Sequence, residues 1–212
     1  MNFRMWISSL AGGSPVRLTS ADAGEEWAGS WSPDGSRVAY LHSQSGKPTT
    51  LMTVKTSGNA APVILREHVS PLVPDWSPAG DWITYRDEKG WNLISPDGKM
   101  SKFLGKIEAP YLAFSKDEKL IYGIQTGAIE DVHDRAILFS LDPVTLKQKV
   151  IKNLGKDLEP LSPYNPGIRL SMAPDGKSFV YSTAYYRQDL WMLTGYRQPG
   201  WWGRISDALN LK

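Results

Sequence analysis

Residues 31–40 read Trp-Ser-Pro-Asp-Gly-Ser-Arg-Val-Ala-Tyr, and this stretch decides the fold because its pattern returns three times along the chain. Each copy places a turn between a bulky apolar residue and an alternating run that ends in tyrosine, which is typical of a tight β-hairpin. The other copies are Trp-Ser-Pro-Ala-Gly-Asp-Trp-Ile-Thr-Tyr at 76–85, Phe-Ser-Lys-Asp-Glu-Lys-Leu-Ile-Tyr at 114–122 and Met-Ala-Pro-Asp-Gly-Lys-Ser-Phe-Val-Tyr at 172–181.

The residue types at the turn explain its geometry. Proline presets φ at the first corner, aspartate can bond nearby backbone amides, and glycine tolerates the positive φ at which the second strand begins. The copies start at 31, 76, 114 and 172, so the intervals are 45, 38 and 58 residues. A unit of roughly 40 to 45 residues, with one long insertion, has the length of a four-stranded propeller blade.

The motif resembles the Trp-Ser-Pro-Asp-Gly repeat of TolB-type β-propellers, which is also seen in the propeller domains of prolyl-oligopeptidase-like proteins. The resemblance covers nearly the whole chain, with three departures: Ala79 replaces aspartate, Lys116 replaces proline and Glu118 replaces glycine. It implies an all-β fold, a β-propeller of four-stranded antiparallel blades with about four blades plus a leading half-blade. It also implies a periplasmic or extracytoplasmic location, although the sequence shows no convincing signal peptide.

Composition narrows the possible partners. A net charge of +2 with both signs interspersed gives no electrostatic footprint for nucleic acid, so we expect no nucleic-acid partner. No apolar run approaches the roughly 18 to 20 residues that span a bilayer, so membrane insertion is not expected. With no cysteine there is neither a disulfide framework nor a thiolate metal site.

The repeat spacing predicts one domain of successive blades followed by a tail. The predicted units are a half blade at 1–19, blades at 28–66, 72–104, 110–153 and 167–197, and a C-terminal tail at 198–212. We interpret the chain as the C-terminal part of a larger propeller, the alternative being a small ring closed by the half blade. An incomplete ring would leave strand edges and an apolar blade face open, so self-association through them is expected.

The sequence predicts no catalytic, metal or cofactor site. His42, His68 and His133 share no ligand spacing, and there is no Gly-x-Ser-x-Gly elbow, phosphate-binding glycine loop or paired-cysteine motif. The turn aspartates offer one carboxylate each, whereas calcium needs several converging oxygens, so we assign them to turn formation. We expect the tryptophans at strand positions to pack between blades, while Trp201 and Trp202 lie outside the repeat. The strand tryptophans are Trp31, Trp76, Trp82, Trp91 and Trp191.

Blade topology predicts where a partner would bind. The turns between first and second strands, and between third and fourth strands, share one side, which we call the tight-turn face. The loops between second and third strands and the connectors between blades share the other side, which we call the long-loop face. Long loops on a rigid scaffold are where binding is usually found. The long segments at this face are 43–49, 67–71, 126–135, 154–166 and 184–187.

The function predicted from these features is a noncatalytic scaffold that binds a protein or peptide partner through the long-loop face. The residues expected to contact the partner are Asp131, Asp134, Arg135, Tyr164, Tyr185, Tyr186 and Arg187, because tyrosine and arginine most often anchor interfaces. One alternative is an accessory or sensor propeller of a larger peptidase, kinase or transcriptional regulator with an upstream effector domain. Another is glycan or small-ligand binding in a central channel.

Overall fold

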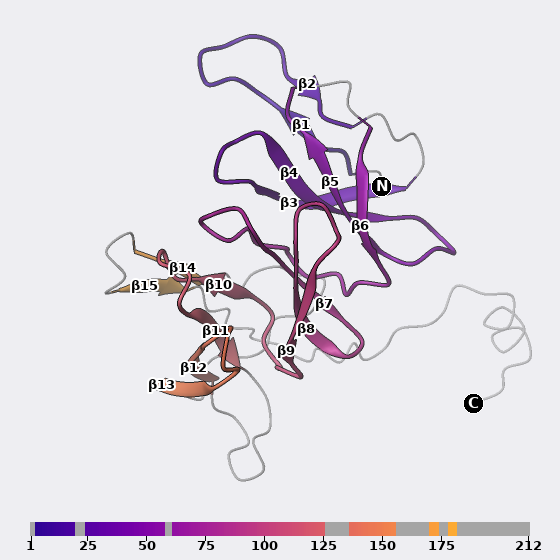
Figure 1. Ribbon diagram of the computed structural model, residues 1–212. Coiled ribbons are helices and arrows are strands. Elements are labelled where there is room, and N and C mark those ends of the chain that lie inside the picture. Colours follow the sequence, from indigo (N-terminus) through magenta and orange to yellow (C-terminus); the bar gives the residue numbers. More distant parts are fainter. Residues whose placement is uncertain are drawn as a thin grey trace, which may run out of the picture.

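The computed structural model describes residues 3–19, 24–57, 61–125, 136–155, 170–173 and 178–181. These residues form only strands, turns and loops, and the strands make antiparallel sheets that follow one another along the chain (Figure 1). The predicted all-β class is therefore confirmed. Among the described residues there is no helix that could cross a membrane.

The first blade is a four-stranded sheet in sequential order. Its strands are β3 (Glu25–Trp31), β4 (Arg37–Ser43), β5 (Thr50–Lys55) and β6 (Val63–Glu67). Strand β3 begins three residues before its predicted start because it continues through a register shift between Trp27 and Ser30. Ala28 within that bulge has a φ of 59°, a left-handed conformation that breaks the alternation on which the prediction relied.

The second blade has three strands, β7 (Ile83–Asp87), β8 (Gly90–Ile94) and β9 (Ser101–Gly105). A strand was predicted at 74–77, but the structure reduces it to a single bridge between Trp76 and Ile83. Pro74 and Pro78 flank this bridge, and because proline has no N–H it cannot extend the ladder.

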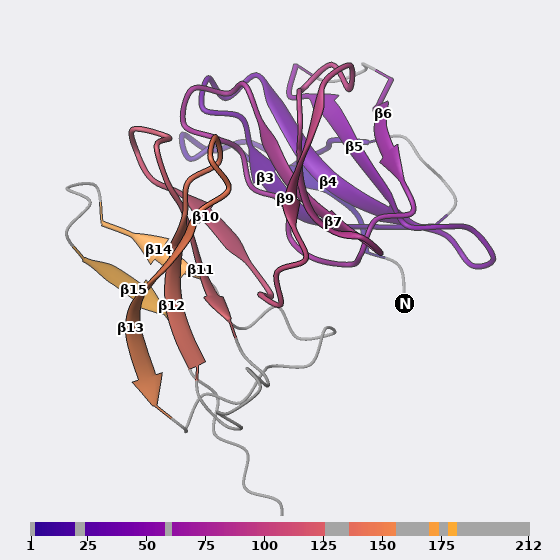
Figure 2. The ribbon, with the colours of Figure 1, turned by 60° about the horizontal axis from the view of Figure 1, so that its bottom comes forward.

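The third blade is a complete four-stranded sheet made of β10 (Leu112–Phe114), β11 (Ile121–Gln125), β12 (Ala136–Leu141) and β13 (Gln148–Gly155). A strand pair, β14 (Leu170–Met172) and β15 (Phe179–Tyr181), follows it in sequence. Strand β14 lies beside β10 and β11, and Phe179 packs against the buried core of the third blade (Figure 2).

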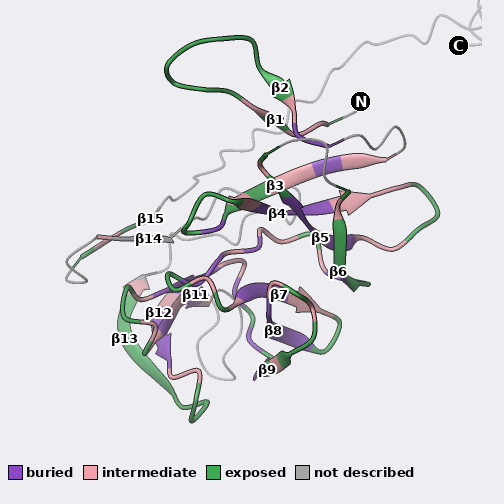
Figure 3. Cartoon of the chain, turned by 45° about the horizontal axis from the view of Figure 1, so that its top comes forward, coloured by how far each residue is buried: buried purple, intermediate pink, exposed green. Residues whose placement is uncertain are grey.

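The core lies between blades, and an aromatic residue from the repeat fills the junction of the first and second blades and that of the second and third. Trp76 is only 7% exposed and packs on Ala39, Leu41 and Leu51 of the first blade. Phe114, 8% exposed, packs in the same way on Trp91 of the second blade. The side chains on the middle strands are accordingly buried, while the outer strands β6 and β13 are mostly exposed (Figure 3).

The prediction that all the strand tryptophans pack between blades was wrong for Trp31, which is 53% exposed. Trp76 and Phe114 each cover a preceding blade, whereas the sheet that precedes the first blade consists, in the described residues, of two short strands. Trp91 is fully buried and Trp82 partly buried as expected. Trp191 and the C-terminal tail lie outside the described residues, and so does the side chain of Met172.

The short N-terminal sheet pairs β1 (Trp6–Ile7) with β2 (Val16–Arg17) and docks on the first blade. Leu18 packs against Val38, Tyr40 and Val54. The buried carboxylate of Glu26 accepts hydrogen bonds from the Thr19 hydroxyl and from the Met5 amide. Burial, and secondarily the charge of Glu26, raises the pKa of the Tyr40 hydroxyl well above its usual value.

The contrast between Trp76 and Trp31 gives a matched test of blade stacking. Replacing Trp76 with alanine should lower the free energy of unfolding by about 3 to 5 kcal/mol, as for a large aromatic removed from a packed core. The loss should include the hydrogen bond of 3.1 Å from the Trp76 indole nitrogen to the Ser30 carbonyl. Trp31→Ala should cost much less because half of that side chain already faces solvent. Urea titrations of both variants measure the free energy of unfolding. Equal losses for the two variants would contradict the conclusion that Trp76, and not Trp31, packs between blades.

Candidate functional site

The two faces of the propeller use their polar residues differently. The tight-turn face carries the β3–β4, β8–β9 and β12–β13 turns together with those at 77–81 and 115–119. The long-loop face carries the β4–β5 loop, the β7–β8 turn and the connectors between blades. The hydrogen bonds made on each face show the difference.

A serine organises the tight turns. The Ser32 hydroxyl donates to Asp34 Oδ1 at 2.6 Å and accepts the Arg37 amide at 2.9 Å, so one side chain holds both ends of the turn. The Asp34 carboxylate also accepts the Ser36 amide at 3.0 Å. Sequence reasoning assigned the turn to proline, aspartate and glycine and missed this serine, although the copies that start at 31, 76 and 114 all carry it.

The same network occurs at a position that the repeat spacing did not indicate. Residues 95–98 read Ser-Pro-Asp-Gly and form the β8–β9 turn, between the last two strands of the second blade. Ser95 donates to Asp97 Oδ1 at 2.6 Å and accepts the Met100 amide at 2.9 Å. The motif therefore marks a turn type at this face and not only the first hairpin of a blade.

The third copy of the repeat forms the turn in spite of its substitutions. Ser115 donates to Asp117 at 2.8 Å and accepts the Leu120 amide at 3.0 Å. Glu118 occupies the glycine position with a φ of 57°. The carboxylate of Glu118 accepts a hydrogen bond from the backbone amide of Ala79, which ties this turn to the turn of the second blade.

Further ties between blades mark the tight-turn face as structural. The Arg37 guanidinium donates to the Pro96 carbonyl at 3.5 Å, which links the first blade to the β8–β9 turn. Gly80 sits against the Pro33 ring, with 3.6 Å between a Cβ placed at Gly80 and the proline Cδ. The side chains of this face are thus engaged in turns and in blade contacts, which agrees with the structural role assigned to the aspartates.

The turn hydrogen bonds lower the pKa values of the aspartates. The Ser32 hydroxyl, followed by the amide and hydroxyl of Ser36, lowers the pKa of Asp34 to about 2. Serine donors likewise lower the pKa of Asp97 and of Asp117. These carboxylates are therefore ionised in the folded protein near neutral pH, and their charge is used to hold the turns.

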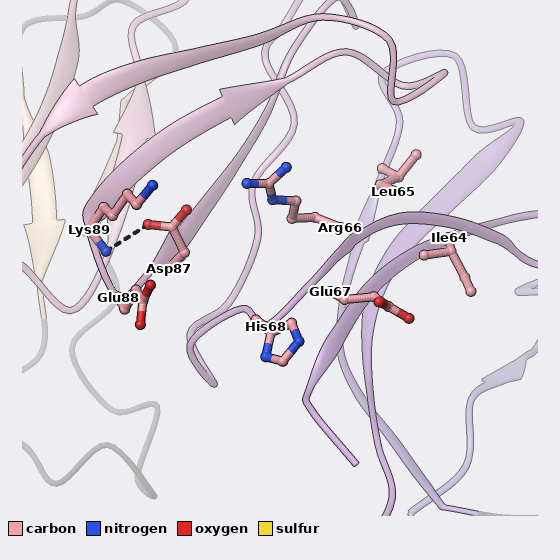
Figure 4. A pocket seen from close by; sticks show the side chains of 8 residues that line it. All are labelled: Ile64, Leu65, Arg66, Glu67, His68, Asp87, Glu88 and Lys89. Atoms are coloured by element: carbon pink, nitrogen blue, oxygen red, sulfur yellow. Dashed lines mark hydrogen bonds between the residues drawn. The ribbon is translucent and has the colours of Figure 1, made fainter.

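All seven residues predicted to contact a partner lie outside the described residues, so that set stays a prediction. In the described part of the long-loop face, a hollow of about 660 Å³ lies between the end of the first blade and the β7–β8 turn of the second blade (Figure 4). One side is formed by Ile64–Glu67 of β6 and by His68, and the other by Asp87, Glu88 and Lys89.

Charged side chains surround this hollow, which we call the blade-junction hollow. Arg66 points across it toward the β7–β8 turn, whereas Glu67 points away from that turn (Figure 4). Asp87 is committed to the turn, since its Oδ1 accepts the Lys89 amide at 2.9 Å and the Gly90 amide at 3.2 Å. The side chains of Arg66, Glu67, Glu88 and Lys89 form no ion pair or hydrogen bond with other described residues.

A charged residue next to the hollow, in contrast, has an ion-pair partner. Arg86, one residue before Asp87, donates to both carboxylate oxygens of Glu108, at 3.1 and 2.9 Å. That ion pair fastens the second blade to the connector that leads into the third. Within the described part of the chain no group of three histidine, aspartate or glutamate side chains could hold a metal ion.

Sequence reasoning found one side of the blade-junction hollow and missed the other. The segment 67–71 was named as part of the long-loop face, and Glu67 and His68 do line the hollow. The β7–β8 turn was overlooked because the loops of the second blade are short. A signal was nevertheless present, since Asp-Glu-Lys at 87–89 places three charges in succession in a tight turn.

The lowered pKa of Asp34 predicts how this turn responds to acid. The folded-state pKa lies below the usual value, so the stabilisation is complete above about pH 4 and is lost as pH falls toward about 2. Asp34→Asn should therefore lower the urea midpoint at pH 7, and the difference from the parent should shrink over this interval. Combining it with Ser32→Ala tests the assignment. Equal effects of Asp34→Asn with and without the serine would contradict it.

Comparisons with known proteins support the fold. No family model matches this sequence, and neither does any curated protein. Among solved structures, a protein assigned as TolB from Agrobacterium tumefaciens matches with a TM-score of 0.59 at 16% identity, covering 85% of this chain and 66% of the other. TolB from Acinetobacter baumannii matches with a TM-score of 0.61 at 17% identity, covering 86% and 43%.

An oligogalacturonate lyase, solved in complex with manganese, matches with a TM-score of 0.67 at 11% identity, covering 87% of this chain and 54% of the lyase. The chain thus spans between about two fifths and two thirds of the length of these structures. At sequence identities this low, the structural similarity is evidence for a shared fold alone. The chain has a β-propeller fold that resembles TolB propeller domains.

Proposed function

We propose that this protein is a noncatalytic propeller scaffold that binds a protein or peptide partner through its long-loop face. The observation that carries the proposal is the blade-junction hollow, where Arg66, Glu67, Glu88 and Lys89 have no ion-pair partner among the described residues. Charged groups beside a concave surface can recognise a partner when they are not already paired within the protein.

The distribution of polar contacts between the two faces supports the same conclusion. Aspartates and serines on the tight-turn face bond to one another and to backbone amides, and two links join the turns of different blades. A partner at that face would compete with contacts on which the turns depend. At the hollow the charged side chains of 66, 67, 88 and 89 are accessible to a partner, because the β7–β8 turn uses only the Asp87 side chain.

The signs of the charges favour a partner of mixed charge. Two cationic and two anionic side chains without partners in the described structure surround the hollow, so neither a polyanion nor a polycation would be attracted as a whole. A protein or peptide segment carries both signs along its length. Its charges would set orientation and specificity, while apolar contact with Ile64, which is 57% exposed, would add to affinity.

Charge reversal at the hollow tests this function. Peptides would first be selected from a displayed random library on the parent protein, and their binding to variants then compared. Arg66→Glu combined with Lys89→Glu should weaken binding by tenfold or more, on the order of the 1.4 kcal/mol that corresponds to a factor of ten. Thermal unfolding should change little, since surface substitutions usually shift stability by no more than about 0.5 kcal/mol.

Lys116→Glu with Lys147→Glu is the matched control, because it reverses two exposed lysines of the tight-turn face that form no ion pair with other described residues. Binding of the selected peptides by this control should equal that of the parent. If the control loses binding and the hollow variant keeps it, the proposed face is wrong. A library that yields no peptide dependent on either face would also overturn the proposal.

The loop residues named from the sequence provide a second test. Single substitutions at Asp131, Asp134, Arg135, Tyr164, Tyr185, Tyr186 and Arg187 should weaken binding of the same peptides while leaving the unfolding midpoint nearly unchanged. Substitutions in the tight turns should do the reverse. Unchanged affinity in every loop variant would remove these residues from the binding surface.

A further inference from the structure

The outer strand of the first blade forms one whole side of the blade-junction hollow. Four consecutive residues of β6, Ile64–Glu67, line the hollow, and His68 continues it. Strand β6 ends its sheet, pairing with β5 on one edge and with no other described strand. A strand at the end of a sheet presents unpaired backbone N–H and C=O groups along its free edge.

In the described residues the last strands of the three larger sheets are β6, β9 and β13, and β6 differs from the other two in its charges. Strand β9 carries Lys102, and β13 carries Lys149 and Lys152, with no acidic residue in either strand. Lysine on an edge strand discourages the addition of another strand. All three have a bulge or register shift, so bulges do not distinguish them.

In β6 the basic and acidic charges are balanced. Arg66 and Glu67 are adjacent, and Val63 and Ile64 are both more than half exposed. Across the hollow, Glu88 and Lys89 repeat the pairing of one acidic and one basic residue. The hollow beside β6 thus holds two charges of each sign, a surface complementary to an extended segment that carries both signs.

We propose that the partner binds by strand addition, placing an extended segment of mixed charge along the free edge of β6. This mode rests on the proposed function at the same hollow and specifies the form of the partner. Main-chain hydrogen bonds would give affinity, as in other cases of strand addition, while the charged side chains would select the segment. The β7–β8 turn would contact the exposed side of the added strand.

A synthetic peptide of defined sequence tests strand addition directly. The probe is the acetylated and amidated heptapeptide Thr-Lys-Val-Glu-Val-Lys-Thr, which favours an extended form and carries both signs. Because main-chain bonding is tolerant of sequence, we expect a Kd of about 1 mM. Hydrogen exchange of the whole protein, followed by mass spectrometry, would be measured with and without about 5 mM peptide.

Exchange should slow by about sixfold at amides of 63–67 that face the free edge, because about one molecule in six would remain unbound. Amides of β9 and β13 serve as internal controls and should exchange as before. The variant Glu67→Lys with Glu88→Lys makes the hollow cationic and repels the probe, whose net charge is positive, so it should lose most of the protection. Lys102→Glu with Lys149→Glu should retain it. No slowing in β6, or equal slowing in all three outer strands, would overturn the proposal.

A second peptide separates strand addition from binding by side chains alone. The same heptapeptide N-methylated at all seven residues keeps the charges but has no backbone N–H group on either edge, so it should not protect β6. If both peptides protect β6 equally, strand addition is wrong and the proposed binding face survives. Suppose that the valine peptide protects β6, but that library-selected peptides bind the Arg66→Glu, Lys89→Glu variant as tightly as the parent. In that case strand addition stands and the proposed function falls.

Discussion

The packing of one aromatic side chain on the preceding blade is the interaction on which the rest of this structure depends. Trp76 covers the apolar surface of β4 and β5, and its indole nitrogen reaches the backbone of β3. Phe114 covers the second blade in the same manner. Single blades expose an apolar face and are poorly stable alone, so this contact fixes both the spacing of the blades and the position of their ends.

Blade stacking also determines what each face can do. It brings the turns of successive blades close enough for Glu118 to bond the Ala79 amide and for Arg37 to reach Pro96. On the opposite face it places the end of β6 beside the β7–β8 turn, with an open hollow between them. The turns of one face are therefore joined by polar contacts between blades, while the hollow on the other face retains charged groups without ion-pair partners among the described residues. The same stacking produces a structural face and a candidate binding face.

The repeat motif allowed the fold class to be predicted from the sequence, because turn chemistry and strand alternation are local properties. The strand predicted at 74–77 is reduced to a single bridge, because Pro74 and Pro78 lack the backbone N–H that would extend it, although its apolar pattern is that of a strand. The exposure of Trp31 could not be predicted, as it depends on what precedes the blade in space. The turn at 115–119 formed without proline or glycine because Ser115 and Asp117 supply its hydrogen bonds. The hollow depends on two segments, 64–68 and 87–89, that are distant in the sequence, and no local pattern indicates that they meet.

Photo-crosslinking tests most directly the central claim that partners bind at the long-loop face beside the junction of two blades. A library-selected peptide with a photoreactive residue would be crosslinked to the intact protein, and the attachment sites mapped by mass spectrometry. The account predicts attachment within 64–68 and 87–89, on the two sides of the hollow. Attachment concentrated in the turns at 32–36, 95–99 and 115–119 would contradict it.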